Sequence, residues 1–434
     1  MAEHAGKTCR NQTIYSVFVR NHTQEGTFEG VRRDLPRIKA LGADIIWLMP
    51  IHPLGVKARK GSLGSPYAIR DYRAVNPEFG DLDDFRRLVD GIHDLGMKCI
   101  IDVVYNHTSP DSVLALEHPE WFYHREDGSF GNRVGDWSDI IDLDYGDRGL
   151  WDYQIETLKY WASMVDGFRC DVASLVPLAF WQEAREAVEA VRPGCLWLAE
   201  TVDPRFIAAM RAMGFECMSD CQAYGAFDIC YDYDIYLLFR DYLDGKIPLG
   251  RYAEAVNQQE VIYPGNYSKL RFLENHDQLR AAFLIPDEGA RLNWTAFSFF
   301  QKGTGFIYAG QEAGCAHLPS LFDKDPVDWS GPDDTELFQK LCALKKHPLF
   351  TDSSYQVKAL PGDVLYAVHS KGERRLAGVF SVRGDSALVA VDEPDGWYEN
   401  LLDGGRVEVR EGRLSCHGQP IVLESANPRK DKEM

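Results

Sequence analysis

Three carboxylates in this chain stand where apolar, strand-like runs of sequence end. Asp171, Glu200 and Asp277 each follow such a run, and Arg169 and His276 flank two of them. In a chain that alternates strands and helices, the C-terminal ends of parallel strands meet on one face, which carries the active site in barrel enzymes. Packing alone gives no reason for three charges placed in this way. The pattern indicates an enzyme.

The runs that would position these carboxylates predict an α/β fold of the (β/α)8 TIM-barrel class. Eight strand-like runs occur at residues 14–19, 43–50, 98–104, 165–170, 195–199, 217–220, 270–273 and 305–309. Stretches with apolar residues at helical spacing separate them, as between Val31 and Leu41, where the pattern stops at Gly42. Such alternation predicts a parallel barrel surrounded by helices.

The rest of the chain is organised around this barrel, to which we assign residues 1–350. A polar, aromatic and glycine-rich stretch at residues 108–140 lies between the third and fourth strands. A loop of that length predicts a lid or a substrate-binding excursion. From residue 351 the pattern changes to short alternating runs separated by Gly, Asp and Asn. Residues 351–434 are therefore expected to form a C-terminal antiparallel β-sandwich domain.

Composition restricts the partners and the compartment. Lys and Arg number 47 against 66 Asp and Glu, which gives a net charge of −19 and disfavours nucleic acid and anionic membranes as partners. The N-terminal residues lack the apolar core of a signal peptide, and no apolar run approaches the ~20 residues of a membrane span. The ten cysteines are scattered singly, as reduced thiols are. We therefore expect a cytoplasmic location.

Five segments resemble, in order, those of the α-amylase family, glycoside hydrolase family 13. Residues 102–107 (DVVYNH) resemble its first conserved segment, and the three carboxylate segments resemble the second, third and fourth. Residues 303–312 resemble its eighth-strand segment, and the stretch from Ser65 to Gly80 resembles the one before its second helix. The match spans roughly Tyr15 to Glu312, and a β-domain after the barrel also suits the family.

The resemblance implies cleavage of a glycosidic bond with retention of configuration, which needs a nucleophile and an acid/base. Asp171 matches the family's nucleophile and Glu200 its acid/base, and the apolar run before Glu200 would help to raise its pKa. Asp277 matches the third carboxylate, which holds sugar hydroxyls. Arg169 lies two residues before Asp171, so on a strand it points to the same side and would keep that carboxylate ionised.

The same resemblance implies four substrate-binding residues, which are Arg169 and the three that follow. His107 and His276 match the two histidines that bind the sugar beside the scissile bond. Tyr67 matches the aromatic platform on which that sugar stacks. The aromatic residues of the excursion could also stack on glucose rings, but local packing is the favoured reason for them. They are Trp121, Phe122, Tyr123 and Trp137.

Metal binding is a separate question. Asn106 and Asp142 match two positions that ligate calcium in many relatives, whereas Ser174 and Leu175 stand where the secreted amylases have Lys-His. A calcium ion takes six to eight oxygen ligands, and only two candidates are found. We therefore expect no bound metal, and no organic cofactor is implied.

The sequence thus predicts a retaining α-glycoside hydrolase of the α-amylase or α-glucosidase type, acting on malto-oligosaccharides or related α-glucans. A transglycosylase would share its catalytic residues, and a non-catalytic carbohydrate-binding or chaperone relative is an alternative of a different class. Val172, directly after the nucleophile position, accompanies α-1,6 preference in the oligo-1,6-glucosidase branch. Linkage, exo or endo action, chain length and oligomeric state stay open at this stage.

Overall fold

Eight parallel strands close into a barrel in the order β1-β10-β9-β8-β7-β6-β3-β2, which confirms the predicted fold class. The structure is a computed structural model that describes residues 5–135 and 137–426. The barrel strands are β1 (Thr13–Val17), β2 (Ile45–Leu48), β3 (Lys98–Val103), β6 (Gly167–Cys170), β7 (Leu196–Ala199), β8 (Ile229–Tyr231), β9 (Lys269–Arg271) and β10 (Thr304–Tyr308).

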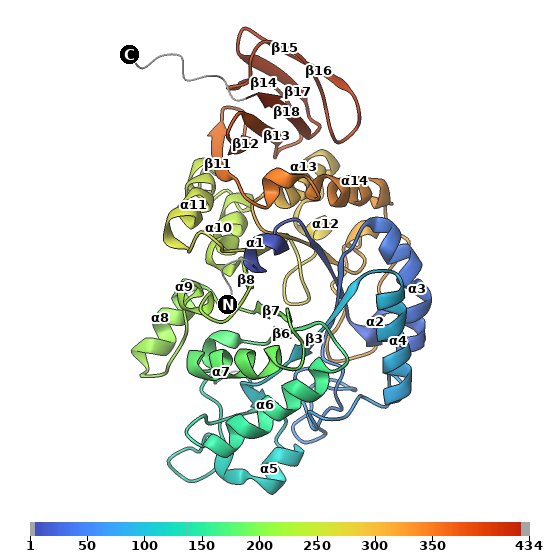
Figure 1. Cartoon of the computed structure of the whole chain (residues 1–434), viewed down its shortest axis with the longest axis vertical. Helices are drawn as coiled ribbons and strands as arrows, with labels where there is room; N and C mark the ends of the chain where they lie inside the picture. The colour runs from blue at the N-terminus through green and yellow to red at the C-terminus, as the bar shows by residue number, and fades with distance from the viewer. Residues whose placement is uncertain (1–4, 136, 427–434) are drawn as a thin grey trace.

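Helices surround the barrel and keep its strands parallel (Figure 1). The longer ones are α3 (Phe28–Leu41), α4 (Leu82–Asp94), α6 (Arg148–Ala162), α7 (Leu178–Glu189), α8 (Pro204–Ala212), α10 (Tyr233–Leu243), α11 (Leu249–Ile262), α13 (Glu288–Phe300) and α14 (Thr335–Lys345). Short helices are α1 (Ala5–Cys9), α2 (Val19–His22), α5 (Val113–Glu117), α9 (Asp220–Ala223) and α12 (Ala281–Leu284). The predicted helix before Gly42 is α3, and Gly42 ends it with a φ of 97° that glycine adopts readily.

The sixth strand was predicted in the wrong place. Residues 217–220 form no strand, because Ser219 and Gln222 make a capping box that starts α9. The sixth barrel strand is β8, whose three buried residues supply the ladder positions between β7 and β9. A strand of three residues is too short to show the two-residue period of a β-strand. The segment before it, which in fact begins α9, was therefore assigned as the strand instead.

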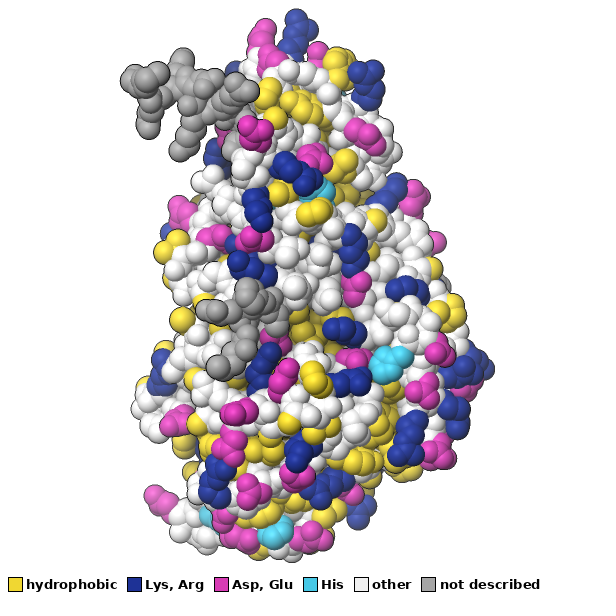
Figure 2. All heavy atoms as spheres, viewed as in Figure 1, with side chains coloured by type: hydrophobic (Ala, Val, Ile, Leu, Met, Phe, Trp, Pro, Cys, Tyr) yellow, Lys and Arg dark blue, Asp and Glu magenta, His cyan; other side chains and the backbone are white. Residues whose placement is uncertain are grey.

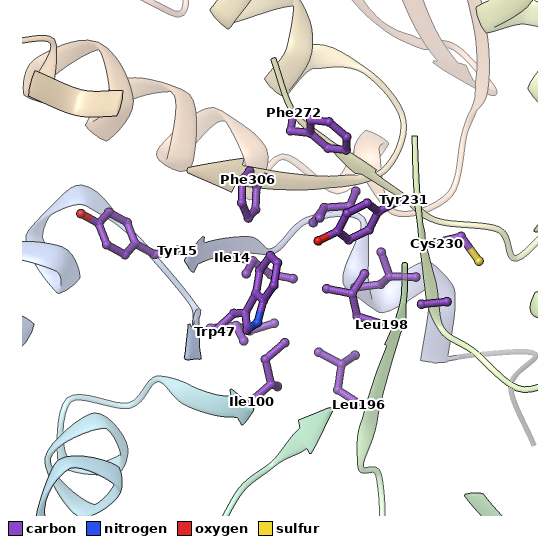
Figure 3. Close-up of a cluster of buried hydrophobic side chains, with 14 of the residues drawn as sticks. Ile14, Tyr15, Trp47, Ile100, Leu196, Leu198, Cys230, Tyr231, Phe272 and Phe306 are labelled. Atoms are coloured by element: carbon purple, nitrogen blue, oxygen red, sulfur yellow. The ribbon is translucent and has the colours of Figure 1, made fainter. Parts of the chain in front are cut away.

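The barrel interior is filled by alternate residues of its strands. Figure 3 shows Ile14, Trp47, Tyr231 and Phe306 converging, while Tyr15 points away from them. All five side chains are buried. Successive residues of a strand face opposite sides, so every second residue points into the barrel. The last inward residue of each strand therefore lies at the barrel mouth.

The excursion after the third strand is closed at its base by a two-stranded ladder. β4 (His107–Thr108) pairs antiparallel with β5 (Ile141–Asp142), and the registered partners are His107 with Asp142 and Thr108 with Ile141. The segment between them contains α5 and lies at the opposite end of the molecule from the C-terminal sheets (Figure 1). The ladder therefore holds the two ends of the excursion together next to His107.

Two antiparallel four-stranded sheets follow the barrel, as predicted. The first has the order β11-β12-β13-β18 and the second β14-β17-β16-β15. Their strands are β11 (Ser354–Leu360), β12 (Val364–Lys371), β13 (Arg374–Ser381), β14 (Ser386–Ala390), β15 (Gly396–Glu399), β16 (Arg406–Arg410), β17 (Arg413–His417) and β18 (Ile421–Ala426). Sequence patterns missed β11, β15 and β17, although these strands alternate buried or half-buried with exposed residues. One apolar cluster joins both sheets, and α13 packs beneath them (Figure 1).

The surface carries both signs of charge, interspersed over the face drawn in Figure 2. Nine of the ten cysteines are buried, Cys221 is exposed, and none is in a disulfide. Among the described residues, none of the helices is both long enough and apolar enough to cross a bilayer.

Candidate active site

Arg169 lies at the centre of the carboxylate cluster. Its Nη1 donates to Asp102 Oδ1 at 2.9 Å and to Asp171 Oδ1 at 2.7 Å. Its Nη2 lies 2.8 Å from Glu200 Oε2. The guanidinium is fully buried. One cation is therefore shared by three carboxylates, and its two terminal nitrogens hold Asp171 and Glu200 side by side.

The strand register produces this arrangement. Asp102 on β3 pairs with Arg169 on β6, and Arg169 pairs in turn with Leu198 on β7. Asp171 and Glu200 each lie two residues further along their strands, and therefore on the same inward side. The backbone confirms the alignment, because Asp171 N–H donates to Val103 O and Glu200 N–H to Cys170 O. The predicted same-side placement of Arg169 and Asp171 is confirmed.

Val172 adopts a backbone conformation that β-branched residues avoid. Its φ is 40° and its ψ is 42°, in the left-handed region. Conformations of this kind cost on the order of 1–3 kcal/mol and are retained where the surroundings impose them. Here the turn aims the Val172 N–H at Glu200 Oε2, 2.8 Å away. The residue after Asp171 thus orients Glu200 through its backbone, which no side-chain pattern could have predicted.

Burial raises the pKa of all three carboxyl groups around Arg169. For Asp102 and Asp171 the guanidinium opposes this rise, and neighbouring carboxylates reinforce it. For Glu200, burial comes first, and the charges of Asp171 and Asp277 raise the pKa further. One cation cannot compensate three buried anions, so the cluster retains a proton near neutral pH. The Arg169 guanidinium opposes the rise in the pKa of Glu200 as well.

Two buried histidines lie beside the carboxylates. His107 Nε2 is 3.9 Å from Asp171 Oδ2, and His276 Nε2 is 3.2 Å from Asp277 Oδ2. Burial lowers the pKa of both imidazoles to about 4. They are therefore neutral at physiological pH and can donate one hydrogen bond each to a neutral hydroxyl.

Tyr67 is joined to this group through its hydroxyl. The Tyr67 Oη lies 2.6 Å from His276 Nε2 and donates to Asp102 Oδ2 at 3.3 Å. Its ring stacks against the His276 ring at 5.5 Å between centroids. The structure therefore brings Tyr67, His276, Asp102 and Arg169 into one connected network at the barrel mouth.

The loop that carries Asp277 is held by a buried ion pair that the sequence did not reveal. Glu274 accepts from Arg280 Nη1 and from Ala281 N–H, both at 2.6 Å. Arg280 Nη2 donates to Ala309 O at 2.9 Å, which ties the loop to the end of β10. The Asp277 side chain, in contrast, is 40% exposed. The clasp fixes the backbone around Asp277 and leaves its carboxylate open to a ligand.

A cavity of about 260 Å³ opens beside Glu200. Its apolar walls include Val202, Phe206 and Leu237, together with Trp137 from the excursion. The Trp137 ring also lies 5.8 Å from the His107 ring. The other excursion aromatics pack locally: Trp121 stacks on His118, Phe122 lies against Phe130, and Tyr123 lies under the Arg133 guanidinium. Of the four aromatic residues considered from sequence, only Trp137 lines this cavity.

The residues at the expected calcium position do not form a cation cage. Asp142 Oδ2 accepts from the Arg133 backbone N–H at 2.7 Å and has the Arg133 guanidinium at 3.5 Å. Asp142 Oδ1 is buried without a protein partner, and the Asn106 amide lies 3.1 Å from His107 Nδ1. Within the described ranges, no three His, Cys, Asp or Glu side chains gather as metal ligands. The donor set falls short of the six to eight oxygens that calcium takes.

At the C-terminal ends of β6 and β7 the barrel presents two carboxyl groups held by one guanidinium, both with a raised pKa. These are the groups that a glycoside hydrolase needs. Comparison with known proteins agrees with that class. The family model described as "Alpha amylase, catalytic domain" matches residues 10–120, and "Bacterial Alpha amylase C-terminal domain" matches residues 356–423.

Solved structures extend the similarity over the whole chain. The crystal structure of an α-amylase from Lactobacillus plantarum is 49% identical with a TM-score of 0.94, covering 96% of this chain and 99% of that one. A noncanonic maltogenic α-amylase from Thermotoga neapolitana is 33% identical with a TM-score of 0.85, at the same coverage. The chain belongs to the α-amylase family of glycoside hydrolases.

The curated relatives that match are longer than this chain. An α-amylase from Haloarcula japonica is 28% identical over 75% of this chain and 47% of its own length. An α-1,4-glucan:maltose-1-phosphate maltosyltransferase from Pseudomonas aeruginosa is 34% identical over 46% of this chain and 34% of its own length. The chain thus spans half or less of the length of the curated relatives it matches.

The arrangement of Asp142 and Arg133 predicts that a metal chelator has little effect. After dialysis against EDTA, we expect activity and melting temperature to stay unchanged, because the guanidinium and the β4–β5 ladder hold this corner of the site. Enzyme dialysed without chelator is the control. A steep fall in melting temperature that calcium alone reverses would show that a cation binds at Asp142 Oδ1 and would contradict this account.

Proposed function

We propose that this protein is a retaining α-glycoside hydrolase that cleaves α-glucosidic bonds in malto-oligosaccharides or related α-glucans. The observation that carries the proposal is the Arg169 guanidinium between Asp171 and Glu200, with contacts of 2.7 and 2.8 Å. Because one guanidinium contacts both carboxyl groups, Asp171 can act as the nucleophile while Glu200 acts as acid and then base, which is the division of roles in a retaining enzyme.

In the first step, an Asp171 oxygen attacks the anomeric carbon while Glu200 gives its proton to the departing glycosidic oxygen. The bond between the anomeric carbon and that oxygen breaks as the glycosyl–aspartate bond forms. In the second step, Glu200, now ionised, takes a proton from water or from a sugar hydroxyl. The oxygen so activated attacks the same carbon and releases Asp171. Each carboxyl group thus returns to its starting state.

The remaining site residues would hold the sugar whose bond is cleaved. Asp277, with its exposed carboxylate, accepts hydrogen bonds from ring hydroxyls, and neutral His107 and His276 donate to them. Tyr67 offers the part of its ring that His276 leaves uncovered as the stacking surface. Arg169, assigned from the sequence to the substrate-binding residues, would act through the carboxylates, because its terminal nitrogens contact Asp102, Asp171 and Glu200.

Transfer to a sugar acceptor is the second candidate, and one observation favours it. The cavity on the Glu200 side is walled by apolar residues, which bind the face of a sugar better than they order a water. The maltosyltransferase from Pseudomonas aeruginosa, whose name states a transfer reaction, is 34% identical over the part it shares with this chain. Hydrolysis and transfer would use the same covalent intermediate and differ only in the acceptor.

The proposal assigns residues 1–350 to the catalytic barrel, 108–140 to an inserted domain and 351–434 to a C-terminal β-sandwich that supports it. α13 and the first sheet pack together, with Phe297 5.5 Å from Phe380 between ring centroids. The pairing of β4 with β5 closes the inserted segment at its base.

A time course with maltotriose, panose, isomaltose and sucrose, followed by chromatography, tests the substrate class. We expect glucose or maltose from maltotriose, because the site accepts an α-glucosyl unit next to an apolar acceptor cavity. The product must first appear as the α-anomer, which NMR detects before mutarotation. Products longer than the substrate would favour transfer. Absence of cleavage of every α-glucoside, or a first-formed β-anomer, would contradict the proposal.

Replacing the proton donor separates leaving groups that need protonation from those that do not. Glu200→Gln should lower kcat on maltotriose by about 10²–10⁴-fold and lower it far less on α-glucosyl fluoride, whose fluoride leaves unaided. Because the pKa of Glu200 is raised and the acid must be protonated, wild-type activity is lost as pH rises through that pKa. The variant should lack this basic limb.

Glu216→Gln makes the same chemical change at an exposed position and is the matched control. It should leave both substrates and the pH profile unchanged. Equal losses on the two substrates in Glu200→Gln, or a basic limb that persists in it, would assign the proton donor elsewhere.

A further inference from the structure

A second and larger cavity, of about 740 Å³, takes no part in the mechanism above. One wall comes from the chain around the end of α2 and from α3, and the other from the segment after β10. Among the described residues, it has no lining residue in common with the cavity beside Glu200. Volumes of this size are typical of small-ligand sites.

Tyr15 shows where this cavity lies relative to the barrel. Ile14 points into the barrel and Tyr15 points away from it (Figure 3). The Tyr15 hydroxyl donates to Glu312 Oε1 at 2.5 Å, and Glu312 lines the cavity. The cavity therefore lies outside the barrel wall. Its lining segments follow the C-terminal ends of β1 and β10, which places it on the same side of the barrel as the catalytic carboxylates.

Trp329 forms a fixed aromatic wall of the cavity. The Arg37 guanidinium covers its ring at 4.6 Å, and the His22 ring meets it edge-on at 5.5 Å. Its Nε1 donates to His22 O at 3.3 Å. The side chain nevertheless remains 38% exposed. An indole held in this way offers a flat surface without losing further conformational entropy when a ligand binds.

Among the described residues, four carboxylates and two guanidinium groups line the cavity, and all of them except Asp333 are paired with each other. Arg37 bridges Asp34 and Glu312, both at 2.7 Å, and Arg33 lies 2.7 Å from Glu25. An anionic ligand would meet an excess of carboxylates, whereas the hydroxyls of a neutral ligand could donate to Asp333 and to the lone pairs that the ion pairs leave free. The lining thus favours an uncharged, hydroxyl-rich molecule with a flat apolar face.

His22 supplies an independent sign of a missing polar partner. The residue is 1% exposed and its Nε2 lies 2.8 Å from Asp34 Oδ2. Its Nδ1 is buried without a hydrogen-bond partner, although the ring lines the cavity. A buried polar atom without a partner costs about 1–3 kcal/mol.

We propose that this cavity is a second carbohydrate-binding site, which holds a neutral α-glucan chain against Trp329 outside the catalytic mouth. The ligand class rests on the proposed function, and the site itself rests on the cavity, its aromatic wall and the unpaired carboxylate of Asp333. Since the site and the carboxylates share one side of the barrel, a chain bound here is held on the face where cleavage occurs.

Binding stoichiometry tests the proposal. Maltotriose is titrated calorimetrically into Glu200→Gln, which cleaves it too slowly to interfere, and we expect two equivalents per chain. Adding Trp329→Ala should lower the affinity for the second maltotriose by about tenfold or more, because aromatic anchors dominate binding energy. Adding Trp329→Phe, which keeps a flat ring and the packing, should weaken it less. Thermal melting of each variant checks the fold.

Trp397→Ala is the matched control, because Trp397 is also an exposed indole covered by an arginine, Arg406, at 4.8 Å. The Trp397→Ala variant should still bind two equivalents of maltotriose per chain. A single equivalent in the Glu200→Gln background, or two equivalents of unchanged affinity in both Trp329 variants, would overturn the second site. Two equivalents in a protein that cleaves none of the α-glucosides would instead overturn the proposed function and leave this site standing.

Discussion

The buried contact between Arg169 and three carboxylates is the interaction on which the rest of the structure depends. Removing charged groups from water is expensive, and an ion pair repays that cost only with good geometry and further hydrogen bonds. Arg169 meets both conditions, with Asp102, Asp171 and Glu200 on its terminal nitrogens and the Tyr231 hydroxyl at 3.2 Å from Nε. Because the negative charges outnumber the positive one, the cluster keeps a proton, and chemistry that needs one ionised and one protonated carboxyl group becomes possible.

The barrel makes this cluster through register. Neighbouring strands place Asp102, Arg169 and Leu198 at one level, so the inward positions one step higher carry Asp171 and Glu200. The cost of the arrangement appears as local strain at Val172, whose left-handed backbone points its N–H at Glu200. Beyond the cluster, the Glu274–Arg280 clasp joins the Asp277 loop to the end of β10. Closure of the barrel thus brings residues far apart in sequence to one mouth.

The parts of the site that the sequence could predict are those encoded locally. The same-side relation of Arg169 and Asp171 follows from strand period two, and the carboxylates follow apolar runs that can be recognised without a partner. The prediction of the sixth strand was wrong because β8 is only three residues long and a capping box precedes it. Val172, the Glu274–Arg280 clasp and the Trp329 wall were missed for another reason. They depend on backbone conformation or on contacts between distant segments, which no residue pattern encodes.

The most direct test of the account is the identity of the residue that becomes covalently attached to the sugar. The enzyme is incubated with a fluorinated α-glucosyl fluoride, whose fluorine slows breakdown of the intermediate more than its formation, and the digest is analysed by mass spectrometry. The account predicts one glycosylated peptide, with the modification on Asp171, and its loss in Asp171→Asn. A label on Glu200 or Asp277, or turnover without any covalent intermediate, would contradict the assignment of Asp171 as the group that Arg169 holds ready for attack.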